Sequence, residues 1–462
     1  MKKITFIALF LSLWNLSTFA QDQNEEALFI RGIYDKALTQ GRCYPWLQHL
    51  TKNIGNRISG STSAAKAVEW TAQMLDTLGL DSVWLQPCMV PHWERGGKEE
   101  AHLIASKSMK NASLNVLALG GSGAGKVRAE VIEVKSLDEV DKLGEAGIKG
   151  KIVFFNRPMD PTQIGVFSAY GGAVDQRVAG PARAAKYGAV AAIVRSMTTR
   201  IDDFPHTGTT AFNDVEPIPA VAVSTRHAEM LSKLIQSEGS VKVFIKTNCR
   251  KLPDAPSHNV IGEIRGSRFP DEYIVVGGHL DSWDVGEGAH DDGTGCVQSM
   301  DVLNVLKRTG YRPQRSIRCV LFMNEENGLA GGKKYAEEAE RKKEKHLCAI
   351  ESDSGGHTPR GLSFDGEEGV FVPAFRNISA WSELLEPYGL VLKKGGGGSD
   401  ISPLKKQKVM LCGLNADSQR YFDYHHTAND TFEAVNQREL ELGVAAMASL
   451  IYLLDKNGLS NQ

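Results

Sequence analysis

Histidine and carboxylate side chains follow apolar stretches of this chain at four places. At the first place, His279 and Asp281 come directly after the apolar run 273–276, and the pair Asp291–Asp292 follows within a glycine-rich segment. Three further apolar runs lead into acidic or histidine-containing segments, at 317–326, 347–353 and 409–431. Imidazole and carboxylate groups gathered together are the ligands that divalent metal ions of hard or borderline character take in proteins. A polar loop that only satisfies backbone groups would explain any one of these segments, but their joint occurrence favours a metal site.

Some of these side chains form a chemically balanced set for two metal ions. Two divalent ions can share one bridging carboxylate if each ion also receives one imidazole and one further carboxylate, with a hydroxide between the ions. Three ligating carboxylates and one hydroxide cancel the charge of two divalent ions, so such a site carries no large buried imbalance. The candidate ligands are His279, Asp291, Glu326, Asp353 and His426.

Two further acidic residues have expected roles beside this set. Glu325 is adjacent to a candidate ligand and is not needed as one, so it is free to accept a proton from the water between the ions. Neighbouring residues of a strand point to opposite faces, so the strand must end before Glu325 and Glu326 if both side chains are to reach the metals. Asp281 lies two residues after His279, where it can hold the imidazole and fix its tautomer.

The elements that must position these residues are short buried strands. The run 273–276 has no polar alternation, which predicts a strand buried on both faces of a parallel sheet. Its carboxyl end would deliver His279 and Asp281, and a helix is expected soon after Asp292, where apolar residues recur at helical spacing. Strand and helix patterns alternate to the end of the chain. The sequence therefore predicts an α/β fold with a mainly parallel central sheet flanked by helices.

A segment with a different residue pattern interrupts this alternation of strands and helices. From residue 114 to 247, short strands alternate with glycine-rich turns and an alanine-rich helix, which predicts a smaller, β-rich inserted domain. The expected division is a catalytic domain in two parts, 21–113 and 251–462, with the inserted domain at 114–250 and a proline-containing linker at 251–256. The first part should contain a helix over 25–40, an amphipathic helix ending before Gly79, and a strand over 82–90.

Composition and the N-terminus bear on partners and compartment. The 462 residues carry a formal charge of −2 without a basic block, so nucleic acid and anionic membranes are not expected partners. Two lysines, an apolar run and small residues up to Ala20 predict a signal peptide over 1–20, and hence a secreted or periplasmic protein. No later apolar run is long enough for a membrane span. The seven cysteines are odd in number and scattered, so most are expected to be buried thiols.

Several motifs resemble those of a known enzyme family, the co-catalytic di-zinc exopeptidases, over nearly the whole mature chain. The resemblance rests on the segments 279–284, 291–292, 324–326, 351–353 and 425–426. The inserted segment resembles a protease-associated domain at 150–153, 184–189 and 218–221. The resemblance implies the zinc exopeptidase fold and two zinc ions per chain.

The same resemblance assigns roles to individual residues. It implies that Asp291 bridges the ions, that one ion also takes His279 and Asp353, and that the other takes Glu326 and His426. It makes Glu325 the general base and then the general acid, and it implies a cis peptide bond between Asp291 and Asp292.

Three more residues are candidates for contacts with the substrate. The pattern His-Thr-x-x-Asp-Thr over 426–431 selects His426 rather than His425 as the ligand. In those relatives of the family that have a tyrosine before the ligand histidine, that tyrosine steadies the oxyanion, and here the position is His425. Whether His425 does the same or only packs beside the site stays open. Ser399 and Asp400, after the glycine run 395–398, are the other two candidates.

The expected function is that of a secreted zinc-dependent exopeptidase that hydrolyses small peptides, above all dipeptides. Aminopeptidase or true carboxypeptidase action on longer peptides stays open, because the motifs do not separate these activities. A non-catalytic binding ectodomain of the same fold is the alternative of another class, but every candidate ligand position and Glu325 are filled here. The expected partner is a small peptide substrate, and a homodimer stays open.

Overall fold

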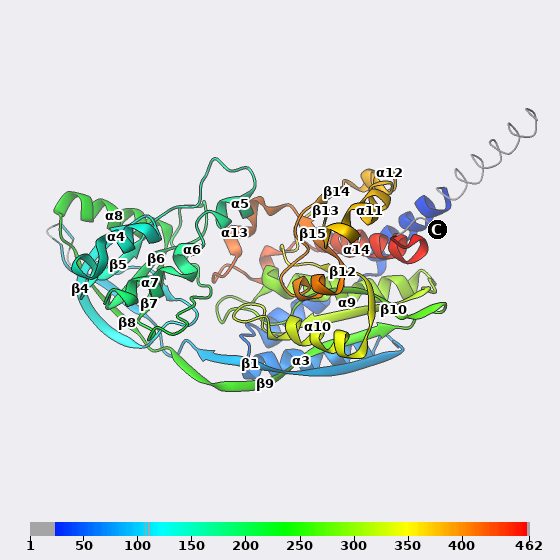
Figure 1. The fold of residues 1–462 in the computed structure, drawn as a ribbon, viewed down its shortest axis with the longest axis horizontal. Helices are drawn as coiled ribbons and strands as arrows, with labels where there is room; N and C mark the ends of the chain where they lie inside the picture. Colours follow the sequence, from blue (N-terminus) through cyan, green and yellow to red (C-terminus); the bar gives the residue numbers. More distant parts are fainter. Residues whose placement is uncertain (1–23, 107, 110, 460–462) are drawn as a thin grey trace, which may run out of the picture.

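The computed structural model of the protein describes residues 24–106, 108–109 and 111–459. The predicted signal peptide, residues 1–20, lies outside the described residues. The molecule has two lobes, and each is built around its own β-sheet (Figure 1). The long strands β1 (Ser82–Glu94) and β9 (Arg250–Ile264) run from the first lobe to the second.

The first lobe contains an eight-stranded sheet. Its strand order is β1, β9, β11 (Arg315–Phe322), β10 (Phe269–His279), β12 (Lys345–Glu351), β15 (Met410–Ala416), β13 (Pro359–Asp365) and β14 (Val391–Lys394). The central strands β11, β10, β12 and β15 are parallel, whereas β9 and β13 run antiparallel to the strands of this central group. The predicted α/β fold with a mainly parallel central sheet is therefore confirmed, and the carboxyl ends of the central strands lie at one edge.

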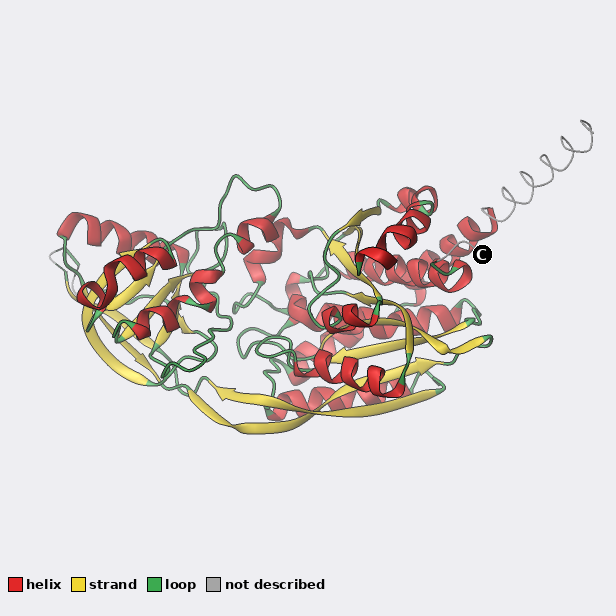
Figure 2. Ribbon diagram, in the orientation of Figure 1, coloured by secondary structure: helices red, strands yellow, loops and turns green. Residues whose placement is uncertain are grey.

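Helices cover both faces of this sheet (Figure 2). Alternate residues of β10 point to opposite faces, so Ile274 and Val276 belong to one hydrophobic core and Val275 to another. The first core is closed by α2 (Cys43–His49), α3 (Thr62–Asp76), α9 (Thr294–Arg308), α11 (Glu368–Ser379), α12 (Ser382–Leu385) and α14 (Gln437–Asn457). The second core is closed by α10 (Ala330–Lys342) and the 3-10 helix η4 (Ser402–Gln407). The predicted helices over 25–40 and before Gly79 are both present.

Residues 100–247 form the second lobe, around a seven-stranded sheet. Its strand order is β2 (Glu100–Ala105), β8 (Lys242–Thr247), β4 (Gly125–Val134), β5 (Ile152–Phe155), β6 (Ala191–Arg195), β7 (Ala220–Val223) and β3 (Val116–Ala118). Its helices are α4 (Leu137–Ile148), α5 (Val166–Gly171), α6 (Asp175–Val178), α7 (Gly180–Lys186) and α8 (Thr225–Glu238). Buried strand residues alternate between two hydrophobic cores, as Val153 and Phe154 do.

Two predicted boundaries are wrong. The start at residue 114 is too late, because β2 pairs with β8 in the sheet of the second lobe. The expected linker 251–256 is part of β9, because this segment pairs with β1 along the strands that join the lobes. Pro91 and Pro253 lie where the register shifts, at a bulge that does not require their missing N–H groups.

Short elements complete the chain between these units. They are η1 (Leu50–Ile54), η2 (Ala289–Gly293), η3 (Glu386–Tyr388), η5 (Ser418–Arg420), α13 (Tyr421–Tyr424) and η6 (Phe432–Ala434). All seven cysteines are buried free thiols, as expected. Within the described ranges, every helix is too short or too polar to cross a membrane.

Candidate metal centre

The carboxyl ends of the central strands bring the candidate ligands together. β10 ends at His279, and β12 ends at Glu351, two residues before Asp353. β11 ends at Phe322, so Glu325 and Glu326 lie in the turn that follows. The prediction that the strand must end before this pair of glutamates is confirmed. His426 comes from the loop after α13.

Asp291 lies between the two imidazoles. His279 Nε2 is 3.2 Å from Asp291 Oδ1, and His426 Nε2 is 3.1 Å from Asp291 Oδ2. His279 Nε2 is also 3.4 Å from Asp353 Oδ1, while His426 Nε2 is 3.0 Å from Glu326 Oε2. The five side chains thus form two sets, each with one imidazole and one carboxylate of its own, that share the two oxygens of Asp291.

The cluster has carboxylate oxygens that are free to bind metal cations. Asp291 Oδ2 and Glu326 Oε1 are buried and accept no hydrogen bond from any described residue. Burial raises the pKa of Glu326 to about 8 and that of Asp353 to about 6. Burial alone would lower the pKa of His426, but the carboxylates of Glu326 and Asp291 raise it to about 10. Nitrogen and carboxylate donors in this arrangement suit two zinc ions.

Asp281 supports the cluster differently from what we expected. The His279 Nδ1 atom lies 3.0 Å from the backbone carbonyl of Asp281 and 3.9 Å from its carboxylate. The carboxylate instead accepts hydrogen bonds from the backbone N–H groups of Asn324 at 2.6 Å, Glu325 at 3.0 Å and Glu326 at 3.4 Å. The carbonyl fixes the imidazole tautomer, and the side chain holds the turn that carries the two glutamates.

Two acidic residues hold the segment around Asp291. Asp292 accepts hydrogen bonds from the N–H groups of His279 at 3.0 Å and Gly295 at 2.9 Å, so its carboxylate supports the loop. Asp430 accepts from the N–H groups of His290 at 2.6 Å and Asp291 at 3.1 Å. The Asp291–Asp292 peptide bond is cis, as the resemblance implied. We did not single out Asp430, although it is the aspartate of the His-Thr-x-x-Asp-Thr pattern.

Arg57 is a second supporting residue that local sequence patterns do not reveal. Its buried guanidinium donates hydrogen bonds to the carbonyls of Leu280 at 2.8 Å, Glu287 at 2.9 Å and Gly288 at 2.9 Å. These bonds fix the loop between His279 and Asp291. The partners lie more than two hundred residues along the chain from Arg57, so local sequence patterns carry no signal for them.

Glu325 differs from its neighbour Glu326. Glu326 is buried, whereas Glu325 is half-buried. The Glu325 carboxylate makes no hydrogen bond or ion pair with any described residue. The Glu325 charge is close enough to the cluster to contribute to the raised pKa of Asp353, after the larger effect of burial. Glu325 is therefore a free carboxylate at the edge of the candidate metal site.

His425 lies against the cluster without completing it. Its ring stacks on that of His426 with centroids 3.5 Å apart, and its Nε2 is 3.9 Å from Asp291 Oδ2. Burial and the neighbouring charge of His426 lower the pKa of His425 well below its usual value, which keeps the imidazole neutral. A neutral imidazole can donate one hydrogen bond, so both an oxyanion contact and a packing role fit this position.

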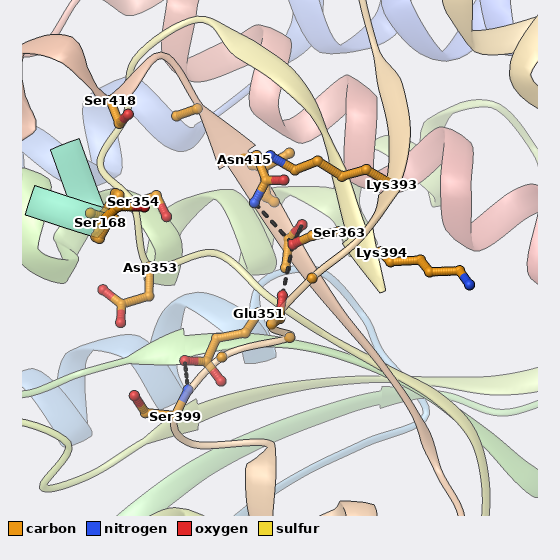
Figure 3. Close-up of a pocket in the computed structure, with 18 residues that line it drawn as sticks. Ser168, Glu351, Asp353, Ser354, Ser363, Lys393, Lys394, Ser399, Asn415 and Ser418 are labelled. Atoms are coloured by element: carbon orange, nitrogen blue, oxygen red, sulfur yellow. Dashed lines mark hydrogen bonds between the residues drawn. The ribbon is translucent and has the colours of Figure 1, made fainter. Parts of the chain in front are cut away.

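A cavity of about 590 Å³ opens beside Asp353 (Figure 3). Ser399 and the glycine loop 395–398 line it, and Glu351 accepts a hydrogen bond from Ser399 N at 3.0 Å. Asp400 is buried behind this loop, and its carboxylate oxygens have no hydrogen-bond partner among the described residues. Burial and the Glu351 charge raise the pKa of Asp400 well above its usual value. Of these two candidates, Ser399 is thus the one that lines the cavity beside the cluster.

The sequence and fold match known proteins. Residues 259–451 match the family model described as Peptidase family M28. Carboxypeptidase Q of Bos taurus is 34% identical over 424 residues, which cover 91% of this chain and 86% of the relative. Carboxypeptidase Q of Xenopus laevis is 36% identical over 421 residues, which cover 90% of this chain and 86% of the relative.

Solved structures share the architecture. A Peptidase M28 precursor from Shewanella amazonensis SB2B superimposes with a TM-score of 0.89 at 31% identity, covering 95% of this chain and 99% of that one. An aminopeptidase from Aneurinibacillus sp. strain AM-1 has the same fold, with a TM-score of 0.62 at 21% identity over 91% of this chain and 96% of that one.

Proposed function

The chain belongs to peptidase family M28 and is a metallopeptidase, and on this premise we propose that it is an exopeptidase with two zinc ions per chain. Its substrates are small peptides, above all dipeptides, and it acts outside the cytoplasm. The observation that carries the proposal is the position of Asp291, whose two oxygens each face one imidazole, at 3.2 and 3.1 Å. We assign His279 and Asp353 to one ion, Glu326 and His426 to the other, and Asp291 to both.

The protein residues divide the chemical work. Bound zinc ions would polarise the scissile carbonyl and lower the pKa of a water molecule. Glu325 takes the proton of that water as general base and returns it to the leaving amine as general acid. The free Glu325 carboxylate and its anchored backbone N–H support this role. A neutral His425 can donate a hydrogen bond to the developing oxyanion.

The surroundings of the cluster support a short substrate. The cavity beside Asp353 has a volume of about 590 Å³ and is lined on one side by Phe167 and Ser168 of the second lobe. This contribution from the second lobe supports the proposal that only short peptides reach the cluster. The lysine pair, apolar run and small residues before Ala20 support export with cleavage of a signal peptide.

The proposal is tested with the mature protein and a set of short peptides. Zinc content is measured by elemental analysis, and activity is followed on free dipeptides before and after chelation. We expect two zinc ions per chain, loss of activity on chelation and recovery on addition of zinc. Active protein without a bound transition metal would falsify the metal assignment.

End-blocked peptides test the exopeptidase assignment separately. Each peptide is offered free, N-acetylated, C-amidated or blocked at both ends, and the products are identified by mass spectrometry. We expect single amino acids from free dipeptides and no cleavage of doubly blocked long peptides. Loss of activity only on N-acetylation identifies an aminopeptidase, loss only on C-amidation a carboxypeptidase, and internal cleavage contradicts exopeptidase action.

A further inference from the structure

A loop of the second lobe reaches the metal centre and contacts only one of the two ligand sets. This loop, residues 207–209, is the clamp loop. It forms hydrogen bonds with His426 and with Glu326, the residues assigned to the same ion. Within the described residues, no hydrogen bond joins this loop to His279 or Asp353, and His279 is held by Asp281 of its own lobe. The two ion sites therefore differ in how they are built.

His426 is held by the clamp loop through two backbone contacts. Thr207 N donates to His426 O at 3.0 Å, and the Thr207 carbonyl lies 3.2 Å from His426 Nδ1. The second contact places a proton on Nδ1 and leaves Nε2 free to face Asp291 and Glu326. His426 has a φ of 60°, a conformation that a residue with a Cβ adopts only when its surroundings hold it there. The two bonds to Thr207 supply such surroundings.

Glu326 is held by the same loop at the level of its backbone. Thr209 Oγ1 donates a hydrogen bond to the Glu326 carbonyl at 2.7 Å. Thr209 is itself fixed in the second lobe, where it forms a β-bridge with Gly120. The turn that carries Glu326 is thus tied to both lobes, to Asp281 by its N–H at 3.4 Å and to Thr209 by its carbonyl.

Arg177 holds the clamp loop from behind. Its side chain is buried, and it donates to the Thr207 carbonyl at 3.3 Å and to Tyr170 Oη at 2.6 Å. Among the described residues this guanidinium forms no ion pair with a carboxylate, and its Nε atom has no hydrogen-bond partner. A buried guanidinium without an anionic partner is costly, so its position needs an explanation other than stability. Its contact with the carbonyl that orients His426 provides one.

We infer that Arg177 and the clamp loop are positioning residues that set the affinity of the ion held by Glu326 and His426. That ion site is complete only when the second lobe is docked, whereas the His279–Asp353 site is complete within the first lobe. The inference rests on the two ions of the proposed function. Partners of this kind typically contribute ~10–100-fold to metal affinity, so the two ions should respond differently when the clamp is weakened.

The first test removes one hydroxyl from the clamp. Thr209→Val keeps the branched shape but cannot donate to Glu326. Thr247→Val is the matched control, because Thr247 Oγ1 also donates to a backbone carbonyl, that of Gly123 at 2.8 Å, without contacting either ligand set. Zinc affinities are measured by competition with a chromophoric chelator. We expect Thr209→Val to weaken one ion by ~10-fold or more and to leave the other unchanged, and Thr247→Val to change neither.

The second test identifies the weakened ion. Arg177→Met removes the contact with Thr207. Arg183→Met is its control, because Arg183 is a partly exposed arginine of the same lobe, paired with Asp141 at 2.8 Å, that contacts neither ligand set. Both changes are also made on an Asp353→Asn background, in which the remaining ion is held by the Glu326–His426 set. Arg177→Met should weaken that ion by ~10–100-fold. Arg177→Met on a Glu326→Gln background should leave the other ion unaffected.

The outcomes separate this inference from the proposed function. If wild-type protein binds fewer than two ions, the proposed function fails, whatever the variants do. If wild-type protein binds two ions but Thr209→Val and Arg177→Met bind both as tightly as wild type, the inference is wrong. Equal weakening of both ions, or a lowered melting temperature of the metal-free protein with unchanged relative affinities, would assign the clamp a general structural role and would also overturn it.

Discussion

Replacing Glu325 by glutamine removes a proton acceptor and leaves the surrounding contacts in place. The turn that carries Glu325 is held through backbone N–H groups, which donate to the Asp281 carboxylate at 2.6, 3.0 and 3.4 Å and do not depend on the Glu325 side chain. The Glu325 carboxylate has no hydrogen-bond or ion-pair partner among the described residues, so the substitution breaks no contact. Its effect on the free energy of unfolding should stay within about 0.5 kcal/mol.

The effect on turnover should be much larger. Loss of a general base lowers the rate by ~10²–10⁴-fold, which corresponds to about 2.7–5.4 kcal/mol in the activation free energy. Glutamine has nearly the same shape as glutamate, and Glu325 is not one of the candidate ligands. KM and zinc content should therefore change little. Glu326→Gln is the matched comparison, because Glu326 is buried and its Oε2 lies 3.0 Å from His426 Nε2. It should lower the affinity for one ion.

The assay combines kinetics with metal analysis on both variants. Steady-state hydrolysis of a dipeptide gives kcat and KM, and competition with a chelator gives the zinc affinities. Near-normal turnover of Glu325→Gln would refute the role of Glu325 as the base. Loss of zinc from Glu325→Gln, with full retention by Glu326→Gln, would show that the two roles are exchanged.

Two further substitutions test the surroundings of the site, and a third tests a buried histidine at the start of β12. A Cβ at Gly278 would overlap the Asp292 carboxylate and Gly295, so Gly278→Ala should lower both zinc binding and the melting temperature. Gly369→Ala is the control, because a Cβ there meets no atom within 4 Å, and it should lower neither. Equal behaviour of the two variants would contradict this expectation. Asp430→Ala leaves the N–H groups of His290 and Asp291 without their acceptor. It should lower the affinity for both ions, since both share Asp291. A loss of affinity for one ion alone would count against Asp291 as a shared ligand. Burial, aided by the charge of Arg318, lowers the pKa of His346 to about 3 from 6.5, so the folded chain binds fewer protons than the unfolded chain between these pH values. Stability should therefore fall as the pH drops below about 6.5, by at most about 1.4 kcal/mol per pH unit for this group, and His346→Gln should make the dependence measured by urea unfolding shallower; an unchanged slope would contradict the assignment.

Much of the first lobe could be predicted because its signals are local. The run 273–276 is apolar because this part of β10 is buried on both faces, and β11 and β12 likewise contain buried apolar runs, at 319–322 and 348–350. A parallel sheet then places the ends of these strands at one edge, so sequence order alone gathers His279, Glu326 and Asp353. The linker expected at 251–256 was wrong because a local signal was misleading. Prolines at 253 and 256 indicated a break, but a bulge and a strand with a single neighbour at that point accommodate them.

The supporting contacts were harder to predict because they join residues far apart in the chain. Asp281 was expected to hold His279 with its carboxylate, whereas its carbonyl lies beside the imidazole and its carboxylate holds residues 324–326. Spacing of two residues predicts proximity but does not say which acceptor is used. Arg57 donates to backbone carbonyls and Asp430 accepts from backbone N–H groups of distant loops, and backbone donors and acceptors leave no mark in a sequence.

The contribution of the second lobe follows from how it is inserted. β1 and β9 pair antiparallel and carry the chain out to the second lobe and back, so the inserted residues stay attached to the edge of the first sheet. The lobe folds back so that Thr207 N lies 3.0 Å from His426 O, a contact between residues 219 positions apart. A lobe that only roofed a cavity would need no hydrogen bonds to the backbones of metal-site residues. The bonds to Glu326 and His426 therefore favour a second lobe that helps to position the site. They also give a reason for the buried Arg177 at this interface, which donates to the Thr207 carbonyl.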